Sequence, residues 1–207
     1  MIRNLPTQDP QQLLRQEPYP VWFFTNEQIA HVWNELPNVP QANYCGVAGA
    51  GDWTLNLASY GKTGTFHLVD NRARALVTLE LKLALLHSFD REHFQSLFEH
   101  PNTASPEMLQ HSAQNVSDAT LSVITQLLQT HRTWNELLRD NHVWYQESWH
   151  ALKNEQYLAY LRSDEAYQRA RNAANTIVLD FGTLQDVLVQ HADGTLGLLY
   201  FSNLLDS

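Results

Sequence analysis

One stretch of this sequence, residues 42–83, constrains the fold more than any other, because apolar runs, glycines and a helical pattern follow one another there in order. An apolar run at residues 44–48 leads into the glycine turn Gly49-Ala50-Gly51-Asp52. A helical pattern covers residues 53–59, and a second apolar run follows at residues 66–69. This order predicts a strand, a glycine turn, a helix and a second strand.

An acidic residue, Asp70, directly follows the second apolar run and lies 19 residues after Gly51. Glycines at the end of a first strand let a ligand approach the backbone, and the helix behind them offers N–H groups. An acid at this distance falls at the tip of the second strand, where it accepts hydrogen bonds from the ribose of a nucleoside cofactor. The alternative interpretation is an ordinary α/β turn with a surface aspartate.

The spacing of the glycines distinguishes between cofactors. The dinucleotide fingerprint G-x-G-x-x-G requires a third glycine three residues after the second. Thr54 holds that position in this chain, and Asn56, five residues after Gly51, is not glycine either. The pattern therefore favours S-adenosylmethionine (SAM) over NAD.

The same stretch resembles the betaine-lipid synthase A family, which are SAM-dependent 3-amino-3-carboxypropyl transferases that act on diacylglycerol. The family pattern is a small-Gly-Asp-Asn turn, an acid-Asn-Pro strand tip and the run Leu-Glu-Leu-Lys-Leu-Ala. The chain keeps Gly51-Asp52, Asp70-Asn71 and the whole run at residues 79–84. It has Trp53 where the family tends to have Asn, and Arg72 where it tends to have Pro. Its last residues, LYFSNLLDS, resemble the family's Ser-Asn-x-x-Asp segment.

This resemblance covers about residues 43–98 and 176–206 and implies an α/β fold with a Rossmann-like sheet of the SAM-methyltransferase type. Residues 176–179 predict a third strand, and residues 196–201 predict a fourth. The predicted sheet is short at its C-terminal side compared with a full transferase. Its final strand is then an edge that invites pairing with a second copy or with another partner chain.

The 207 residues are expected to form a single SAM-transferase-like domain. Residues 1–24, which are rich in proline, are expected to form an extended N-terminal arm. Residues 104–172 are expected to form a large helical insertion, either a lid over the substrate or a helical subdomain with an aromatic core. In the leucine-rich helix predicted at residues 72–87, Glu80 and Lys82 are expected to be structural.

The resemblance places the expected site at the carboxyl ends of the predicted strands. The expected cofactor-binding residues are Gly49, Ala50, Gly51, Asp52, Asp70, Asn71, Gly182 and Thr183. The glycine turn would surround the methionyl portion of SAM, the acid would hold the ribose, and the turn after the third strand would border the adenine. The expected catalytic residues are Ser202, Asn203 and Asp206, with Asp206 as the general base.

The resemblance implies transfer of a 3-amino-3-carboxypropyl group from SAM to a lipid or small-molecule acceptor. Two alternatives stay open on the sequence. The same fold could transfer a methyl group, since the choice depends on which sulfonium carbon faces the acceptor. The chain could also be a non-catalytic binding or scaffold protein. No metal site is expected, because the ten histidines are scattered without the close spacing of zinc ligands.

The charge balance limits the expected partners. Lys and Arg number 13 against 22 Asp and Glu, for a net charge of −9. This argues against nonspecific nucleic-acid binding, whose affinity comes from phosphate neutralisation. No run approaches about 18 continuous apolar residues, so no transmembrane segment is expected. The single cysteine, Cys45, and the lack of an apolar leader favour the cytoplasm. A cysteine within a buried strand is expected to be inert.

Overall fold

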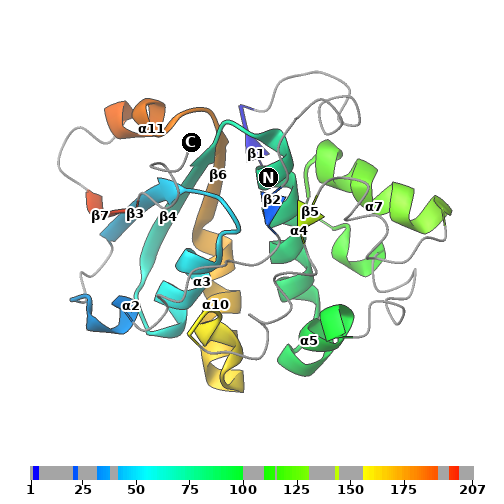
Figure 1. Cartoon of the computed structure of the whole chain (residues 1–207), viewed down its shortest axis with the longest axis horizontal. Helices are drawn as coiled ribbons and strands as arrows, with labels where there is room; N and C mark the ends of the chain where they lie inside the picture. Colours follow the sequence, from blue (N-terminus) through cyan, green and yellow to red (C-terminus); the bar gives the residue numbers. More distant parts are fainter. Residues whose placement is uncertain are drawn as a thin grey trace.

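The computed structural model describes residues 2–4, 21–22, 32–37, 42–99, 110–114, 116–130, 143–144, 156–190 and 196–200. Its centre is a parallel sheet built from β1 (Ile2–Arg3), β3 (Ala42–Val47), β4 (Gly64–Asp70), β6 (Ile177–Phe181) and β7 (Leu196–Tyr200). The strand order is β1-β6-β4-β3-β7. Figure 1 shows β3, β4 and β6 side by side in the middle of the molecule. The expected α/β class is therefore confirmed, and the all-parallel sheet is compatible with a Rossmann-like fold.

The helices follow the strands in the alternation that a parallel sheet requires. The α-helices are α2 (Val32–Glu35), α3 (Asp52–Ser59), α4 (Ala73–Ser88), α5 (Arg91–Glu99), α7 (Asp118–Thr130), α10 (Asp164–Ala173) and α11 (Leu184–Gln190). Two short 3₁₀ helices, η1 (Ala159–Leu161) and η2 (Ala174–Thr176), flank α10. A separate parallel pair joins β2 (Val21–Trp22) to β5 (Val143–Trp144).

Two apolar clusters, one on each face, hold the sheet. The larger cluster takes Tyr44, Phe66 and Leu68 from the strands and packs them against α3 and α4. The smaller cluster joins Cys45 and Val69 to Val187 of α11. Neighbouring strand residues thus point to opposite faces, as the two-residue period of a strand demands. The connections between the strands place α3 and α4 on one face and α11 on the other.

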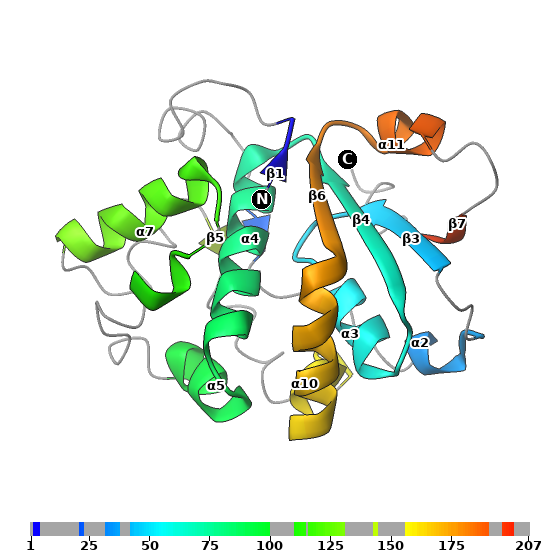
Figure 2. The same cartoon turned by 180° about the vertical axis from the view of Figure 1, so that it is seen from behind.

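The leucine-rich helix α4 is buried on nearly all sides, since thirteen of its sixteen residues are buried. Figures 1 and 2 show the central strands on one side of α4 and helices α5 and α7 on the other. Glu80 fixes α7 to this helix: its Oε2 accepts hydrogen bonds from the Ser117 amide (3.0 Å) and the Thr120 hydroxyl (2.6 Å). The structural role expected for Glu80 matches these contacts.

The N-terminal residues differ in one respect from the sequence-based expectation. Ile2 and Arg3 form strand β1, which pairs with Leu179 and Asp180 of β6 at one edge of the sheet. The predicted arm at residues 1–24 therefore contributes a strand to the central sheet. A strand of one apolar and one polar residue is too short to show the two-residue period, so the sequence pattern does not predict β1. The remainder of the arm, apart from residues 4 and 21–22, lies outside the described residues.

Between residues 104 and 172 the described residues are mostly helical, in α7, η1 and most of α10, with the two-residue strand β5 among them. At the other edge of the sheet lies β7, which pairs with β3. None of the helices in the described part of the chain has the length and apolar character needed to cross a membrane.

A first prediction concerns Gly51, whose φ of +74° lies in the left-handed region. A Cβ on Gly51 would stand 2.3 Å from the Leu79 Cδ1 atom, whereas a Cβ on Gly49 (φ +49°) would meet nothing within 4 Å. Gly51→Ala should cost about 1–2 kcal/mol for the backbone and about 1–3 kcal/mol for overpacking. Gly49→Ala, the matched control, should cost only the backbone part. Urea unfolding measures both, and equal losses would contradict the packing of Gly51 on α4.

A second prediction concerns the pH dependence that Cys45 creates. Burial and, to a smaller extent, the Asp180 carboxylate raise the pKa of the Cys45 thiol from 9.0 to about 11, and a hydrogen bond with the Gly46 backbone opposes part of this shift. Between these two pH values the unfolded thiol loses its proton while the folded thiol keeps it, so stability falls as pH rises. Cys45→Ala removes this contribution. The difference in unfolding free energy between the two proteins should shrink from pH 9 to 11, and a constant difference would contradict the assignment.

Candidate functional site

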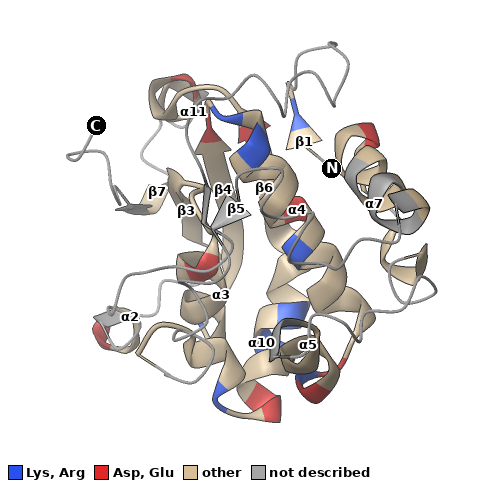
Figure 3. Cartoon of the chain, turned by 45° about the vertical axis from the view of Figure 1, so that its right-hand side comes forward, with Lys and Arg blue, Asp and Glu red and all other residues tan. Residues whose placement is uncertain are grey.

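The carboxyl ends of β3, β4 and β6 meet at one edge of the sheet and bring three of the expected cofactor-binding residues together. The Gly49 amide donates to Asp70 Oδ2 at 3.3 Å. The Gly182 amide donates to the Asp70 carbonyl at 3.1 Å. Figure 3 shows acidic and basic residues meeting at this edge, where the strand ends lie beside the start of α4. A strand end with glycine on either side of an acid is the arrangement expected from the sequence.

The two glycines of the turn after β3 have different surroundings. The side of Gly49 where a Cβ would stand is open, with no atom within 4 Å, and the residue lies beside the Asp70 carboxylate. Gly51 faces Leu79 of α4 instead, so its missing side chain makes room for a helix rather than for a ligand. Of the two, only Gly49 leaves space for a ligand to approach the backbone.

Asp70 is buried, 4% exposed, and its carboxylate is already engaged. Oδ1 accepts from the Arg72 amide at 3.0 Å and from Arg72 Nε at 3.1 Å. The Arg72 Nη2 atom lies 3.4 Å from Oδ2. Because the Arg72 side chain is 37% exposed, the guanidinium has room to leave. A ribose that binds Asp70 must share this carboxylate with Arg72 or displace it.

The turn after β6 is shaped by a helix cap. The Thr183 amide and hydroxyl both donate to Asp186 Oδ2, at 2.8 and 2.6 Å, and close the first turn of α11. These hydrogen bonds hold the pKa of the exposed Asp186 carboxyl below its usual value. The Thr183 hydroxyl is thus committed to the cap, so Gly182 is the part of this turn that stands beside Asp70. Asn71, also expected at the site, is exposed next to Asp70.

The expected contact between Asp52 and the methionyl portion of SAM does not agree with the structure. The Asp52 and Lys82 side chains are both wholly inaccessible, and Lys82 Nζ lies 2.9 Å from Asp52 Oδ1. The Tyr160 hydroxyl donates to the same oxygen at 2.9 Å. The Asp52 side chain therefore faces the protein interior, at the centre of a buried network. Its pairing with Lys82 offsets the cost of burying an isolated charge.

Lys82 also donates to the Ala50 carbonyl, so the network holds the glycine turn at a second point. Burial lowers the pKa of Lys82, and the Asp52 carboxylate offsets part of that effect. Burial and then the same carboxylate raise the pKa of Tyr160 well above its usual value, which keeps the phenol protonated as a donor. The Ala50 backbone and Asp52 serve to position the turn. We name Asp52, Lys82 and Tyr160 the buried triad.

The expected catalytic residues Ser202, Asn203 and Asp206 lie outside the described residues, which end at Tyr200 of β7. The strand order reverses between β3 and β7, and open α/β sheets bind ligands beside such a reversal. In the described ranges, no cluster of three or more His, Cys, Asp or Glu is placed to hold a metal ion.

The sequence does not predict the roles of Arg72, at the strand ends, and of Tyr160, in the buried triad. Arg72 was visible only as a departure from the family pattern, although a basic residue two positions after a strand-tip acid is a usable signal for an ion pair. Tyr160 lies 108 residues from its partner Asp52, and nothing in its local sequence marks it. Lys82 was correctly expected to be structural, but its partner was not foreseen.

No protein-family model matches the chain, and a search of the curated proteins gives no significant match.

A third prediction tests the buried triad. Asp52→Asn leaves Lys82 buried without its counter-charge, so the free energy of unfolding should fall by about 3–5 kcal/mol. The double variant Asp52→Asn/Lys82→Met removes both charges and should recover most of this loss. Urea unfolding of the two single variants and the double variant measures the coupling. A double variant with the summed loss of the single ones would show that the two side chains do not interact.

Proposed function

We propose that the chain is a SAM-binding transferase that moves a 3-amino-3-carboxypropyl group to a lipid or small-molecule acceptor. The observation that carries the proposal is the meeting of Gly49, Asp70 and Gly182 at the carboxyl edge of a parallel sheet. This edge is where open α/β sheets bind nucleoside cofactors. The family resemblance of the surrounding sequence supports the choice of SAM, as does the lack of a third glycine after Gly51.

In this proposal each residue of the edge has a separate task. Asp70 accepts hydrogen bonds from the two ribose hydroxyls after the Arg72 guanidinium has moved aside. Gly49 leaves its open side to the ligand, and Gly182 lies next to the Asp70 backbone, where it would border the base. The buried triad keeps the turn in place without touching the ligand.

Bound SAM would supply an activated carbon next to its sulfonium. Held by Asp70 and the Gly49 turn, this carbon would be open to attack by the acceptor, and the electrons of the broken carbon–sulfur bond would stay on the sulfur. Asp206 would take the proton that the acceptor loses, as general base. Transfer of the aminocarboxypropyl group leaves methylthioadenosine, whereas the alternative, methyl transfer, leaves S-adenosylhomocysteine. Product analysis separates the two.

The third candidate is a non-catalytic binding or scaffold protein, and one observation favours it. The Arg72 guanidinium binds the Asp70 carboxylate, which the ribose would need, and Arg72 stands where the family tends to have proline.

The described sheet ends in an edge strand, β7. We propose, as part of the transferase hypothesis, that a second copy or a partner chain completes the sheet there.

A fourth prediction tests the ribose assignment by titration calorimetry with SAM. Asp70→Asn keeps the shape of the side chain but removes the charge and one acceptor. A hydrogen bond to a charged group is worth about 1.5–3 kcal/mol, so affinity should fall by about tenfold or more. Circular dichroism and thermal unfolding of the variant establish that the fold is kept.

The matched control is Arg72→Ala, which removes the same ion pair but leaves the acid. It should bind SAM at least as tightly as the unaltered chain, since the competing guanidinium is gone. Unchanged affinity in Asp70→Asn would overturn the ribose assignment. No binding by the unaltered chain or by Arg72→Ala would favour the scaffold candidate.

A further inference from the structure

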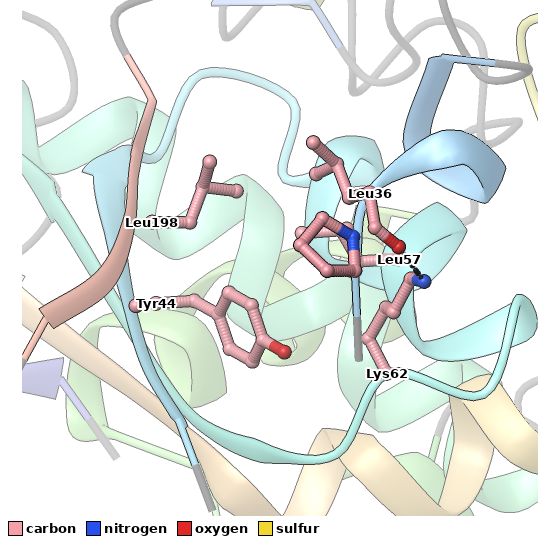
Figure 4. A pocket seen from close by; sticks show the side chains of 7 residues that line it. Leu36, Tyr44, Leu57, Lys62 and Leu198 are labelled. Atoms are coloured by element: carbon pink, nitrogen blue, oxygen red, sulfur yellow. Dashed lines mark hydrogen bonds between the residues drawn. The ribbon is translucent and has the colours of Figure 1, made fainter. Parts of the chain in front are cut away.

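A second site lies at the opposite end of the sheet, beside the beginning of β3. A cavity of about 40 Å³ opens there between α2, α3, β3 and β7. Its walls are mostly apolar, and Tyr44 and Lys62 contribute polar side chains; the lining also includes Leu36, Pro37, Leu57 and Leu198. Figure 4 shows the Tyr44 ring directed into this space, with its hydroxyl turned toward the Lys62 side chain. The cavity is separate from the strand ends that form the candidate cofactor site.

The Tyr44 hydroxyl is buried and has no hydrogen-bond partner among the residues that the structure describes. The residue is only 4% exposed, and its ring stacks on Phe66 with centroids 4.8 Å apart, which fixes its direction. Burial raises the pKa of this phenol, so it is a donor at neutral pH. Buried polar atoms in native proteins are nearly all hydrogen-bonded, so an orphan hydroxyl facing a cavity indicates an absent partner.

Lys62 adds a buried cation to the same cavity. It is 6% exposed, and its ammonium donates to the Leu36 carbonyl. An ammonium has three N–H donors, and this partner carries no charge. Among the described residues, no carboxylate forms an ion pair with Lys62. Lys82, the other buried lysine, has Asp52 as its counter-ion. Buried charges are ordinarily paired, so an anion placed beside the Lys62 ammonium would be stabilised.

We propose that this cavity binds a small monocarboxylate anion. A carboxylate has two oxygens, and the cavity offers two donors, so one oxygen can accept from Lys62 and the other from Tyr44. A water needs about 10–15 Å³ of such space, so a volume of about 40 Å³ suits a group of roughly three to four heavy atoms. The apolar wall from Leu36, Leu57 and Leu198 favours a short hydrocarbon chain over a second charge.

The proposed anion would connect segments that are distant in the sequence. Leu36 follows α2, Lys62 precedes β4, and Leu198 lies in the edge strand β7. Binding there would stabilise β7 against β3, because the ligand contacts both strands. This site goes beyond the proposed transferase function and does not depend on SAM.

The test is a titration of the unaltered chain with sodium formate and sodium acetate, followed by calorimetry and by thermal unfolding at constant ionic strength and pH 7.5. Sodium trimethylacetate, which has the same charge but a bulky chain, is the control for size. We expect a saturable rise in Tm with formate or acetate and none with trimethylacetate. Ligands that bind only the folded state raise Tm in this way.

Tyr44→Phe and Lys62→Met identify the donors, and Tyr60→Phe, a tyrosine outside the cavity lining, is the matched control. Both cavity variants should lose at least tenfold in acetate affinity, while Tyr60→Phe should keep it. Tyr44→Phe retains the ring that stacks on Phe66, so it tests the proposal even if Lys62→Met does not fold. No saturable binding by the unaltered chain would mean that only water fills the cavity, and equal binding by Tyr44→Phe would mean that the anion binds without the Tyr44 hydroxyl; either result would overturn the proposal.

Discussion

The ion pair between Asp52 and Lys82 is the contact on which the arrangement of the candidate site depends. It joins the first residue of α3 to the middle of α4. The Tyr160 hydroxyl donates to the same Asp52 oxygen and so connects η1 to both helices. Lys82 also binds the Ala50 carbonyl, so the glycine turn is fixed from behind at two neighbouring residues. Two charges without access to water are costly to bury, and such pairs are better at specifying one geometry than at adding stability.

With the turn fixed, the positions of the other site residues follow from the sheet. The register of β3 against β4 brings Val47 opposite Val69, so Gly49 comes next to Asp70. The pairing of β4 with β6 brings Phe181 opposite Asp70 and carries Gly182 to the same edge. Asp70 is thus held by backbone groups of two turns and by Arg72. The site is a consequence of strand register, and the partly exposed Arg72 guanidinium is its contact with solvent.

Local patterns sufficed for much of the fold. The apolar runs predict β3, β4, β6 and β7 to within two residues at each end, and the leucine stripe predicts a widely buried α4. Asp70 was placed at a strand tip from spacing alone. Long-range partners were not accessible: the role of Asp52 depends on Lys82 and Tyr160, and Gly51 serves Leu79 rather than a ligand. A short edge strand such as β1 has no periodic pattern, because its only determinant is the partner strand.

The pairing of β1 with β6 has a consequence for how the chain reaches this structure. Ile2 is hydrogen-bonded opposite Leu179, so the first strand of the sheet has no partner until most of the chain has left the ribosome. β3 and β4 are close in sequence and can pair early, because closing a short loop costs less entropy. We therefore expect the sheet to assemble from its middle outward, with the pairing of β1 to β6 formed late.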